Sequence, residues 1–446
     1  MTPILIKGGR IVDPSRGIDR IADLLLEDGL VTGHDRNIRP PRGSRVLDAT
    51  DLVVTPGFVD LHCHLREPGY EDMETIATGT RAAATGGFTT VCAMPNTRPA
   101  IDSWAAVDFV LRKARDEGAV RVLPIGCVTK GSQGLELAEM AELAQAGVIG
   151  YSDDGHPVAD ANIMRQALSY SSSFGLPIIN HCEVPELFSG GAMNEGWVST
   201  RLGLKGIPSS AEEIMVARDI SLAELTGGRV HLAHVTTAGT VELVRRAKEK
   251  GVRVTCEVTP HHLTLSDETV LGHHDGSSPF HPLTPDAYET HAKVNPPLRS
   301  RGDVAAMAEG LRDGVIDFIA TDHAPHNRVN KLCTFDEAAL GISVLETALG
   351  SLMSLVHAGE VTLPLMVEKL TAAPAAFLSR ADLGTLRAGA HADVTIFDAD
   401  AEWTVDAGRF ASKGKNTPLD GVTLKGRVTT TIGGGEVVYE AARADG

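Results

Sequence analysis

The stretch Val59–Gly69, VDLHCHLREPG, follows an apolar run and places His62 and His64 two positions apart. Successive side chains of a strand point to opposite faces, so residues at i and i+2 share one face. The two imidazoles should therefore project together from the end of a buried strand, which suits the binding of one metal ion. A lone H-x-H pair is a weak signal, because neighbouring histidines are often only polar surface. Later strands of the chain repeat the pattern, and this repetition strengthens it.

Eight apolar segments of the middle of the chain have the length and composition of buried strands. They are residues 54–62, 88–96, 120–128, 147–154, 176–183, 229–236, 252–260 and 315–323. Ala-rich segments with helical character, such as DMETIATGTRAAATGG and GTVELVRRAKEKG, or long loops separate them. This alternation predicts an α/β fold, and the count of eight favours a parallel (β/α)8 TIM-like barrel over a doubly wound sheet.

The two ends of the chain look alike and differ from the middle. Residues 1–55 and 385–446 read as short strands punctuated by turn residues, with no extended helical period. We expect these ends to meet in one small β-sandwich domain. The predicted organisation is therefore 1–55 and 385–446 as the two parts of the sandwich and 56–384 as a metal-dependent hydrolase barrel.

Composition narrows the class of protein. A chain of 446 residues with 43% hydrophobic and 22% charged residues has enough apolar material for a large core. Its net charge of −17 argues against a nucleic-acid binder, which needs an electropositive face. The six cysteines show no disulfide spacing, and neither a signal peptide nor a long apolar run is evident. We expect reduced, mostly buried cysteines and a cytoplasmic protein that does not bind membranes.

Residues with metal-binding side chains follow most of the predicted strands. Active sites of such barrels form at the C-terminal ends of the strands, so these residues should lie at one level of the barrel. They are His62, His64, Asp153, His181, His234 and Asp322. Six ligands are too many for one tetrahedral zinc ion but suit two Zn²⁺ ions that share a bridging carboxylate. Asp153 is the expected bridge, although spacing alone does not decide between it and Asp154.

The expected chemistry is hydrolysis. Two metal ions a few ångströms apart would acidify a water molecule and polarise a carbonyl, which is the requirement for cleaving an amide or ester. Asp322 could take the proton of that water and pass it to the leaving nitrogen. Arg66, two residues beyond His64, is suited to bind a substrate carboxylate, and Asn96 offers amide donors at the next strand end.

Several motifs together resemble the amidohydrolase superfamily and, within it, the long bacterial dihydroorotases. The matching pieces are PGFVDLHCHLREPG, TTVCAMPNT, YSDDG, INHCE, HLAHVTTA, VTPHHL, KVNPPLR and IATDHAPH. They occur in order across the predicted barrel, and the resemblance extends to the flanking β-segments. It therefore covers essentially the whole chain.

The resemblance implies a role for each of the six residues. His62, His64 and Asp322 would hold one zinc ion, and His181 and His234 the second. Asp153 would bridge them at the position where many relatives carry a carboxylated lysine, and it matches the family's ligand position better than Asp154 does. No lysine occurs in the segment GVIGYSDDG, which agrees with the carboxylate-bridged variant.

The resemblance also implies the substrate contacts. They would come from His64, Arg66, Asn96, Asn295, His326 and the backbone near Leu340 and Gly341. The chain departs from the family at AALG, which ends at Gly341, at HNRVNK after DHAP, and in a longer insert, HHDGSSPFHPLTP. These departures concern loops around the substrate and leave the predicted metal site intact. His261 and His262 match the family without being ligands, and we expect them to pack or to form hydrogen bonds behind the site.

The implied activity is the reversible hydrolysis of L-dihydroorotate to N-carbamoyl-L-aspartate, the third step of pyrimidine synthesis. A hydantoinase- or allantoinase-like cyclic amidase is the alternative within the same chemistry, and the missing bridging lysine disfavours it. Another class of function is an inactive structural partner of aspartate carbamoyltransferase, but such proteins are expected to have lost metal ligands. A metal-storage module would not explain Arg66, Asn96 and Asn295. We also expect a homodimer, and an association with aspartate carbamoyltransferase is compatible with activity.

Overall fold

The computed structural model describes residues 1–272, 283 and 286–442. Most of the insert HHDGSSPFHPLTP, including His273, His274 and His281, lies outside the described residues. Within the described part, no helix combines the length and the apolar character needed to cross a membrane.

Eight parallel strands form the centre of the molecule, as the alternation of segments predicts. They are β6 (Phe58–Cys63), β7 (Phe88–Ala93), β8 (Arg121–Pro124), β9 (Tyr151–Ser152), β10 (Ile178–Asn180), β13 (Val230–Leu232), β14 (Val254–Val258) and β15 (Phe318–Ile319). They pair in chain order as two sheets, β6-β7-β8 and β9-β10-β13-β14-β15. Parallel bridges between Gly126 and Tyr151 and between Cys63 and His323 join the two sheets at both edges. The eight strands therefore close into a (β/α)8 barrel.

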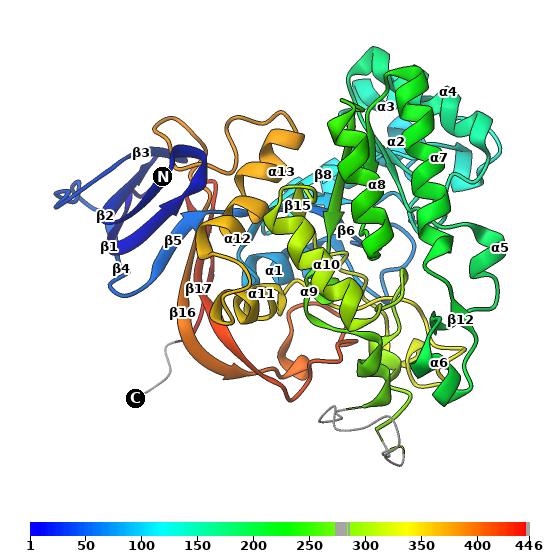
Figure 1. Cartoon of the computed structure of the whole chain (residues 1–446). Coiled ribbons are helices and arrows are strands. Elements are labelled where there is room, and N and C mark those ends of the chain that lie inside the picture. The colour runs from blue at the N-terminus through cyan, green and yellow to red at the C-terminus, as the bar shows by residue number, and fades with distance from the viewer. Residues whose placement is uncertain (273–282, 284–285, 443–446) are drawn as a thin grey trace.

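Helices lie between and around these strands (Figure 1). The longer ones are α1 (Ile76–Thr85), α2 (Trp104–Glu117), α3 (Met140–Ala146), α4 (Ala161–Ser171), α7 (Ser210–Thr226), α8 (Ala238–Glu249), α10 (Arg301–Arg312), α11 (Ala348–His357) and α12 (Leu363–Leu370). The shorter ones are α5 (Pro185–Phe188), α6 (Trp197–Leu202), α9 (Pro260–Thr264) and α13 (Ala372–Phe377), and a small strand pair is formed by β11 (Met193–Asn194) and β12 (Gly206–Ile207). Side-chain caps begin several helices; Asp160, for example, accepts hydrogen bonds from the backbone N–H groups of Asn162 and Ile163 at the start of α4.

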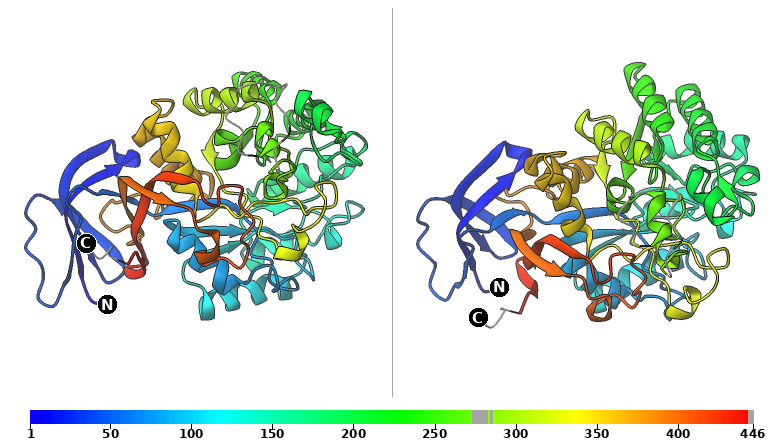
Figure 2. Two further views of the ribbon diagram at one scale, coloured as in Figure 1. Left: turned by 90° about the horizontal axis from the view of Figure 1, so that it is seen from below. Right: turned by 60° about the horizontal axis from the view of Figure 1, so that its bottom comes forward.

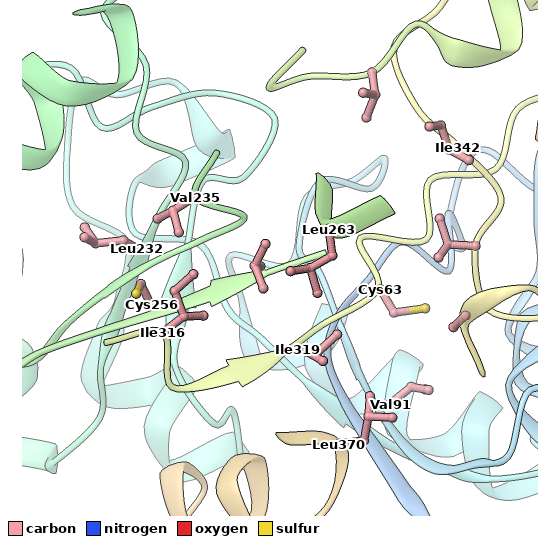
Figure 3. Close-up of a cluster of buried hydrophobic side chains, with 14 of the residues drawn as sticks. Cys63, Val91, Leu232, Val235, Cys256, Leu263, Ile316, Ile319, Ile342 and Leu370 are labelled. Atoms are coloured by element: carbon pink, nitrogen blue, oxygen red, sulfur yellow. The ribbon is translucent and has the colours of Figure 1, made fainter. Parts of the chain in front are cut away.

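The main core fills the space between the strands and their helices. Cys63, Val91, Cys256 and Ile319 are fully or almost fully buried there among aliphatic side chains (Figure 3). Five of the six cysteines are buried, as predicted, and Cys333 is exposed; none of the six is paired in a disulfide.

The two ends of the chain meet in one eight-stranded sheet. Its strands are β1 (Ile4–Asp13), β2 (Ile18–Glu27), β3 (Leu30–Asp35), β4 (Arg45–Asp48), β5 (Val53–Pro56), β16 (Val394–Thr404), β17 (Thr423–Gly433) and β18 (Glu436–Glu440). Antiparallel pairing of β5 with β16 joins the N-terminal and C-terminal parts, and the sheet lies beside the barrel (Figures 1 and 2). The meeting of the two ends follows the prediction, whereas a separate sandwich domain with the stated boundaries stays a prediction.

Candidate active site

His62 and His64 lie together at the C-terminal end of β6, with their ring centroids 5.3 Å apart. The Nε2 atoms of both rings face Asp322 Oδ1, at 3.5 Å from His62 and 3.1 Å from His64. The opposite nitrogens are held from behind: His62 Nδ1 lies 2.8 Å from Glu257 Oε1, and His64 Nδ1 lies 2.9 Å from Asn96 Oδ1. When Nδ1 of each ring donates these hydrogen bonds, Nε2 is left with a lone pair directed into the site.

The carboxylate that faces the histidines belongs to Asp154, so the choice of Asp153 from the sequence is wrong. Asp154 Oδ2 lies 3.4 Å from His62 Nε2 and from His64 Nε2, and its Oδ1 lies 3.3 Å from His234 Nε2. Asp153 Oδ1 instead accepts hydrogen bonds from the backbone N–H groups of Val128 and Thr129, at 2.9 and 3.0 Å, and its Oδ2 accepts one from the Thr129 hydroxyl. Its carboxylate holds the loop after β8 and does not reach the histidines.

Strand alternation explains this difference. Tyr151 in β9 is fully buried, and its hydroxyl donates a hydrogen bond to the carbonyl oxygen of Met140 at the start of α3, so its side chain points toward the helices. The alternation of faces then puts Ser152 and Asp154 on the side of the site and Asp153 on the side of Tyr151. A prediction that first assigned Tyr151 to the helix-facing side would have selected Asp154.

His181 and His234 complete the group from the ends of β10 and β13. His181 Nδ1 lies 3.0 Å from His234 Nε2 and 3.7 Å from Asp154 Oδ1. The backbone of His234 has a φ of 34°, an uncommon value for a residue other than glycine. Buried Glu212 supports the segment that follows, because its carboxylate accepts hydrogen bonds from the backbone N–H and the hydroxyl of Thr236.

Asp322 also has a strained backbone, with a φ of 46°. The residue before it is fixed by a buried carboxylate: Asp60 accepts hydrogen bonds from the backbone N–H of Thr321 at 2.8 Å and from its hydroxyl at 2.6 Å. This contact ties the end of β15 to β6, so that Asp322 and His62 meet although they are far apart in the sequence. The structure thus brings the predicted residues together, with Asp154 in place of Asp153.

The electrostatics of the cluster favour bound positive charge. Burial raises the pKa of the Asp154 carboxyl, but the neighbouring His62 charge and hydrogen bonds from His181 and His234 outweigh this and place it well below its usual range. The pKa of Asp322 is also lowered, since His62 and His64 outweigh burial. Burial lowers the pKa of His62, yet Asp154 and Asp322 together raise it well above its ordinary value. Two ionised, buried carboxylates among imidazoles therefore require protons or metal ions to balance their charge.

The donor set fits divalent metal ions. Potential ligand atoms of His62, His64 and Asp322 lie within 4.8 Å of one another, and so do those of His62, Asp154 and His234. Among the described residues, His62 Nε2 and His234 Nδ1 are buried without a hydrogen-bond partner. A buried nitrogen without a partner is costly, and a metal ion is one way to satisfy it. Imidazole nitrogens combined with carboxylate oxygens are typical zinc ligands.

A buried carboxylate behind His62 is a functional element that sequence reasoning did not identify. Glu257 in β14 lies between His62 Nδ1, at 2.8 Å, and His231 Nε2, at 3.1 Å. Burial raises the pKa of Glu257, but hydrogen bonds from His231 and His62 outweigh this and lower it to about 2. The sequence signal was present, because Glu257 is a charged residue within the apolar run VTCEV, but its partners lie 195 and 26 positions away.

A cavity of about 170 Å³ opens over this cluster. All the predicted substrate contacts line it, namely His64, Arg66, Asn96, Asn295, His326, Leu340 and Gly341, together with Asp154, His181 and Asp322. A second hollow of about 320 Å³ shares Arg66, Asn96 and His326 with it and adds Tyr70 and His156. Another hollow, of about 460 Å³, lies elsewhere, around Thr264 and Arg301, and contains none of the candidate ligands.

Arg66 is a half-buried cation that lines the cavity. Its Nε donates a hydrogen bond to the carbonyl oxygen of Pro325 at 3.3 Å, and its Nη2 lies 3.4 Å from His326 Nε2. The pKa of His326 is lowered to about 3 by burial and by the charge of Arg66, so this imidazole is neutral. In the described structure no acidic side chain forms an ion pair with Arg66, which leaves its charge available to an anionic ligand.

The remaining wall is formed by Asn295 and by the turn at Leu340–Gly341. Asn295 Nδ2 lies 3.0 Å from His181 Nε2, and the carbonyl oxygen of Leu340 lies 2.9 Å from His326 Nε2. Gly341 has a φ of 146°, and a Cβ there would lie 2.6 Å from the carbonyl oxygen of Ala324, so no larger residue fits without movement.

The two histidines of VTPHHL, His261 and His262, differ in their hydrogen bonding. His262 forms hydrogen bonds behind the site, with its Nδ1 2.8 Å from Thr259 Oγ1 and its Nε2 3.0 Å from the carbonyl oxygen of Pro296, next to Asn295. His261 is buried, and neither of its ring nitrogens has a partner among the described residues. Burial lowers its pKa to about 4, so it is neutral.

Known proteins resemble the chain over nearly its whole length. A family described as dihydro-orotase-like matches residues 51–240, and the amidohydrolase family matches residues 212–439. The chain is 52% identical over 442 residues to a dihydroorotase of Anaeromyxobacter dehalogenans (strain 2CP-C), covering 99% of both chains. It is 53% identical to a dihydroorotase of Pelotomaculum thermopropionicum, covering 98% of both chains.

Solved structures with the same architecture include cyclic-amide hydrolases. An L-hydantoinase (dihydropyrimidinase) from Arthrobacter aurescens superposes with a TM-score of 0.85 at 26% identity, covering 99% of this chain and 96% of the other. A D-hydantoinase from Thermus sp. superposes with a TM-score of 0.81 at 22% identity, covering 99% and 97%. The second likeness shows the fold alone.

Proposed function

The chain belongs to the dihydroorotase family of the amidohydrolases, and from that membership we propose that it interconverts L-dihydroorotate and N-carbamoyl-L-aspartate. It is a hydrolase that acts on a cyclic amide, and the activity belongs to pyrimidine synthesis. The observation that supports dihydroorotate as the substrate is the composition of the cavity. It joins a group of buried histidines and carboxylates to an arginine that has no acidic partner in the described structure. Dihydroorotate combines a ring amide with a carboxylate, so it matches both parts.

We propose that the site holds two zinc ions. His62, His64 and Asp322 would hold one, His181 and His234 the other, and Asp154 would bridge them. The support is the 3.3–3.7 Å spacing between Asp154 and the nitrogens of all four histidines. Bound ions of this kind supply Lewis acidity at a carbonyl and lower the pKa of water.

Asp322 is the proposed proton carrier. In the hydrolytic direction, the oxygen of a water molecule forms a bond to the ring amide carbon and the bond from that carbon to the ring nitrogen breaks. Asp322 takes the proton from the water and delivers it to the leaving nitrogen, so the carboxylate is restored at the end of the cycle. Its low pKa keeps it ionised and ready to accept the proton at neutral pH.

Arg66 and Asn96 are proposed to bind the carboxylate of the substrate. A guanidinium group forms paired hydrogen bonds with a carboxylate, and burial in the cavity strengthens them. Asn96 Oδ1 already accepts from His64 Nδ1, so its amide nitrogen is the atom left to donate to the substrate. Asn295, His326 and the Leu340–Gly341 backbone would contact the rest of the ring. Fixing the carboxylate at one end places the reacting amide over the ligand cluster.

A hydantoinase-like activity is the second candidate, because solved structures similar to this chain include hydantoinases. The chain carries Asp154 and no lysine in the segment 147–155, where the alternative family type requires a bridging lysine. Arg66 also has no role toward hydantoin itself, which lacks a carboxylate. The site therefore favours dihydroorotate.

The decisive experiment measures turnover of L-dihydroorotate, hydantoin and allantoin by the purified protein, together with its zinc content. We expect turnover of dihydroorotate alone, close to two zinc ions per chain, and loss of activity on treatment with a chelator. Preference for hydantoin or allantoin would contradict the proposal.

The expected homodimer, cytoplasmic location and association with aspartate carbamoyltransferase are further proposals. Light scattering of the protein alone tests for the homodimer, and light scattering of its mixture with the transferase tests for the association.

A further inference from the structure

A short segment from the C-terminal part of the chain crosses to the cavity and lies behind its wall. We call residues 412–416, SKGKN, the C-terminal strap. At its start, the Ser412 hydroxyl donates a hydrogen bond to Glu74 Oε2, and the backbone N–H groups of Ala411 and Ser412 donate to Glu346 at 2.9 and 3.0 Å. Ser412 Oγ also lies 3.4 Å from His323 Nε2, directly after Asp322 in the chain. The strap is thus fixed to the barrel before it reaches the cavity.

The last residue of the strap, Asn416, joins two segments that line the cavity. Its Nδ2 donates hydrogen bonds to the carbonyl oxygens of Ala324, at 3.0 Å, and Gly341, at 2.9 Å. Its Oδ1 accepts hydrogen bonds from the backbone N–H of His326 and from the hydroxyl of Ser343, both at 2.9 Å. The side chain is only 2% exposed, so all four hydrogen bonds are sheltered from water.

We propose that Asn416 is a positioning residue for substrate binding, which holds His326 and Gly341 in register across the cavity. This inference rests on the proposed function. Asn416 does not line the cavity, so it acts through the two segments that it joins. An amide is suited to this task because one side chain supplies two donors and two acceptor sites, and each of the two segments presents both a carbonyl oxygen and a donor group.

The contact of Gly414 with Pro325 supports the same role independently. A Cβ at Gly414 would lie 2.4 Å from Pro325 Cβ and 2.6 Å from Ser343 Oγ, so the strap approaches the wall as closely as a glycine permits. Pro325 accepts the hydrogen bond from Arg66 Nε through its carbonyl oxygen. A side chain at position 414 would therefore push on the segment that holds Arg66 and His326.

The test compares three variants of the full-length metal-loaded enzyme: Asn416→Ala, Asn416→Asp and Gly414→Ala. Asp keeps the acceptor for the His326 N–H but loses both donors and places a negative charge beside two carbonyl oxygens. We expect each variant to raise the KM for dihydroorotate by about 10-fold, since hydrogen bonds that order the binding wall are lost or displaced. We expect kcat within about twofold of the wild type and unchanged zinc content, because the ligand cluster is not touched.

The matched control is Asn194→Ala. Asn194 is also buried and also joins two segments, since its Nδ2 donates to Asp267 at 2.8 Å and its Oδ1 accepts from Arg299 at 3.1 Å. It does not line the cavity, so this variant should lower Tm and leave KM unchanged. An unchanged KM in the folded Asn416 and Gly414 variants would overturn the proposal, as would a loss of zinc that parallels the loss of activity. Failure of the wild-type enzyme to turn over dihydroorotate would instead overturn the proposed function.

Discussion

The two sides of the cavity are built in different ways. The candidate metal ligands lie at strand ends: His62 is near the end of β6 and His64 follows it, Asp154 follows β9, and His234 follows β13. The opposite side consists of loops that are held by Asn416, which accepts a hydrogen bond from the His326 N–H and donates one to the carbonyl oxygen of Gly341. The first side takes its geometry from the barrel, whereas the second depends on a segment from the far end of the chain. Chemistry and substrate placement should therefore be separable by mutation.

The largest effect is expected from Asp154 on the strand side. Among the described residues, Asp154 has the only carboxylate within 4 Å of all four histidines. In Asp154→Ala the zinc content should therefore fall and kcat/KM should drop by about 1,000-fold. Metal analysis and steady-state kinetics on dihydroorotate measure the two effects.

Asp153→Ala is the natural comparison, because the neighbouring carboxylate is directed away from the histidines. It should lower Tm, since the backbone N–H groups of Val128 and Thr129 lose their acceptor, while zinc content stays at the wild-type value. Loss of zinc in Asp153→Ala with retention in Asp154→Ala would reverse the assignment of the bridge.

Substitution of Arg66 tests whether substrate binding can be weakened without a change in metal binding. Arg66→Ala should raise KM by about 100-fold, because a buried charge pair with the substrate carboxylate is lost. The zinc content should not change, since Arg66 contacts Pro325 and His326 and none of the candidate ligands. Equal zinc together with unaltered kinetics would reject the proposed role of Arg66.

The difference between the two sides of the cavity also explains which site residues could be predicted from the sequence. His62, His64, His181, His234 and Asp322 each stand directly after or close to a buried run, and the barrel predicts that such positions converge. Asp153 and Asp154 are adjacent, and the choice between them depends on which face of a two-residue strand meets the helices. Asn96 and Arg66 were found from their nearness to the same strand ends.

The rest of the site depends on long-range contacts that no local pattern encodes. Glu257 reaches His62 across 195 positions, and Asn416 reaches His326 across 90. Asn295, Leu340 and Gly341 were identified only through resemblance to a family, because loops carry little periodic signal. Even the strap has an ordinary sequence, SKGKN, and its function appears only when its partners are known.

A smaller effect is expected from the carboxylate that supports the strand side. Glu257→Gln keeps the shape of the side chain but weakens its hold on His62 Nδ1 and His231 Nε2. Zinc affinity should fall by about 10-fold, because hydrogen bonds to the outer nitrogen of a ligating histidine raise its basicity and fix its orientation. Competition with a chelator measures the affinity directly, and kcat at saturating zinc should stay near the wild-type value. A variant that binds zinc as tightly as the wild type would show that His62 is held by the barrel alone.

The smallest effect concerns the loop side and appears as a dependence of stability on pH. Glu346, which accepts hydrogen bonds from Ala411 and Ser412, has its pKa raised to about 7 by burial, with Lys415 lowering it and Glu74 raising it further. The folded protein therefore holds a proton that the unfolded chain releases near pH 4.5. The stability that this proton provides is present at low pH and is lost as the pH rises through about 7.

Glu346→Gln cannot ionise, and its single amide oxygen keeps only one of the two hydrogen bonds, because the N–H groups of Ala411 and Ser412 donate to different oxygens of the Glu346 carboxylate. The lost hydrogen bond lowers its Tm at every pH, but the Tm of the variant relative to that of the wild type should rise from pH 5 to pH 8, where the wild type carries a buried charge. Thermal unfolding followed by circular dichroism at several pH values measures the difference. A Tm difference that is the same at every pH would show that Glu346 does not titrate in this range. Because the loop side rests on this contact and the strand side does not, zinc content should be the same in both proteins at each pH.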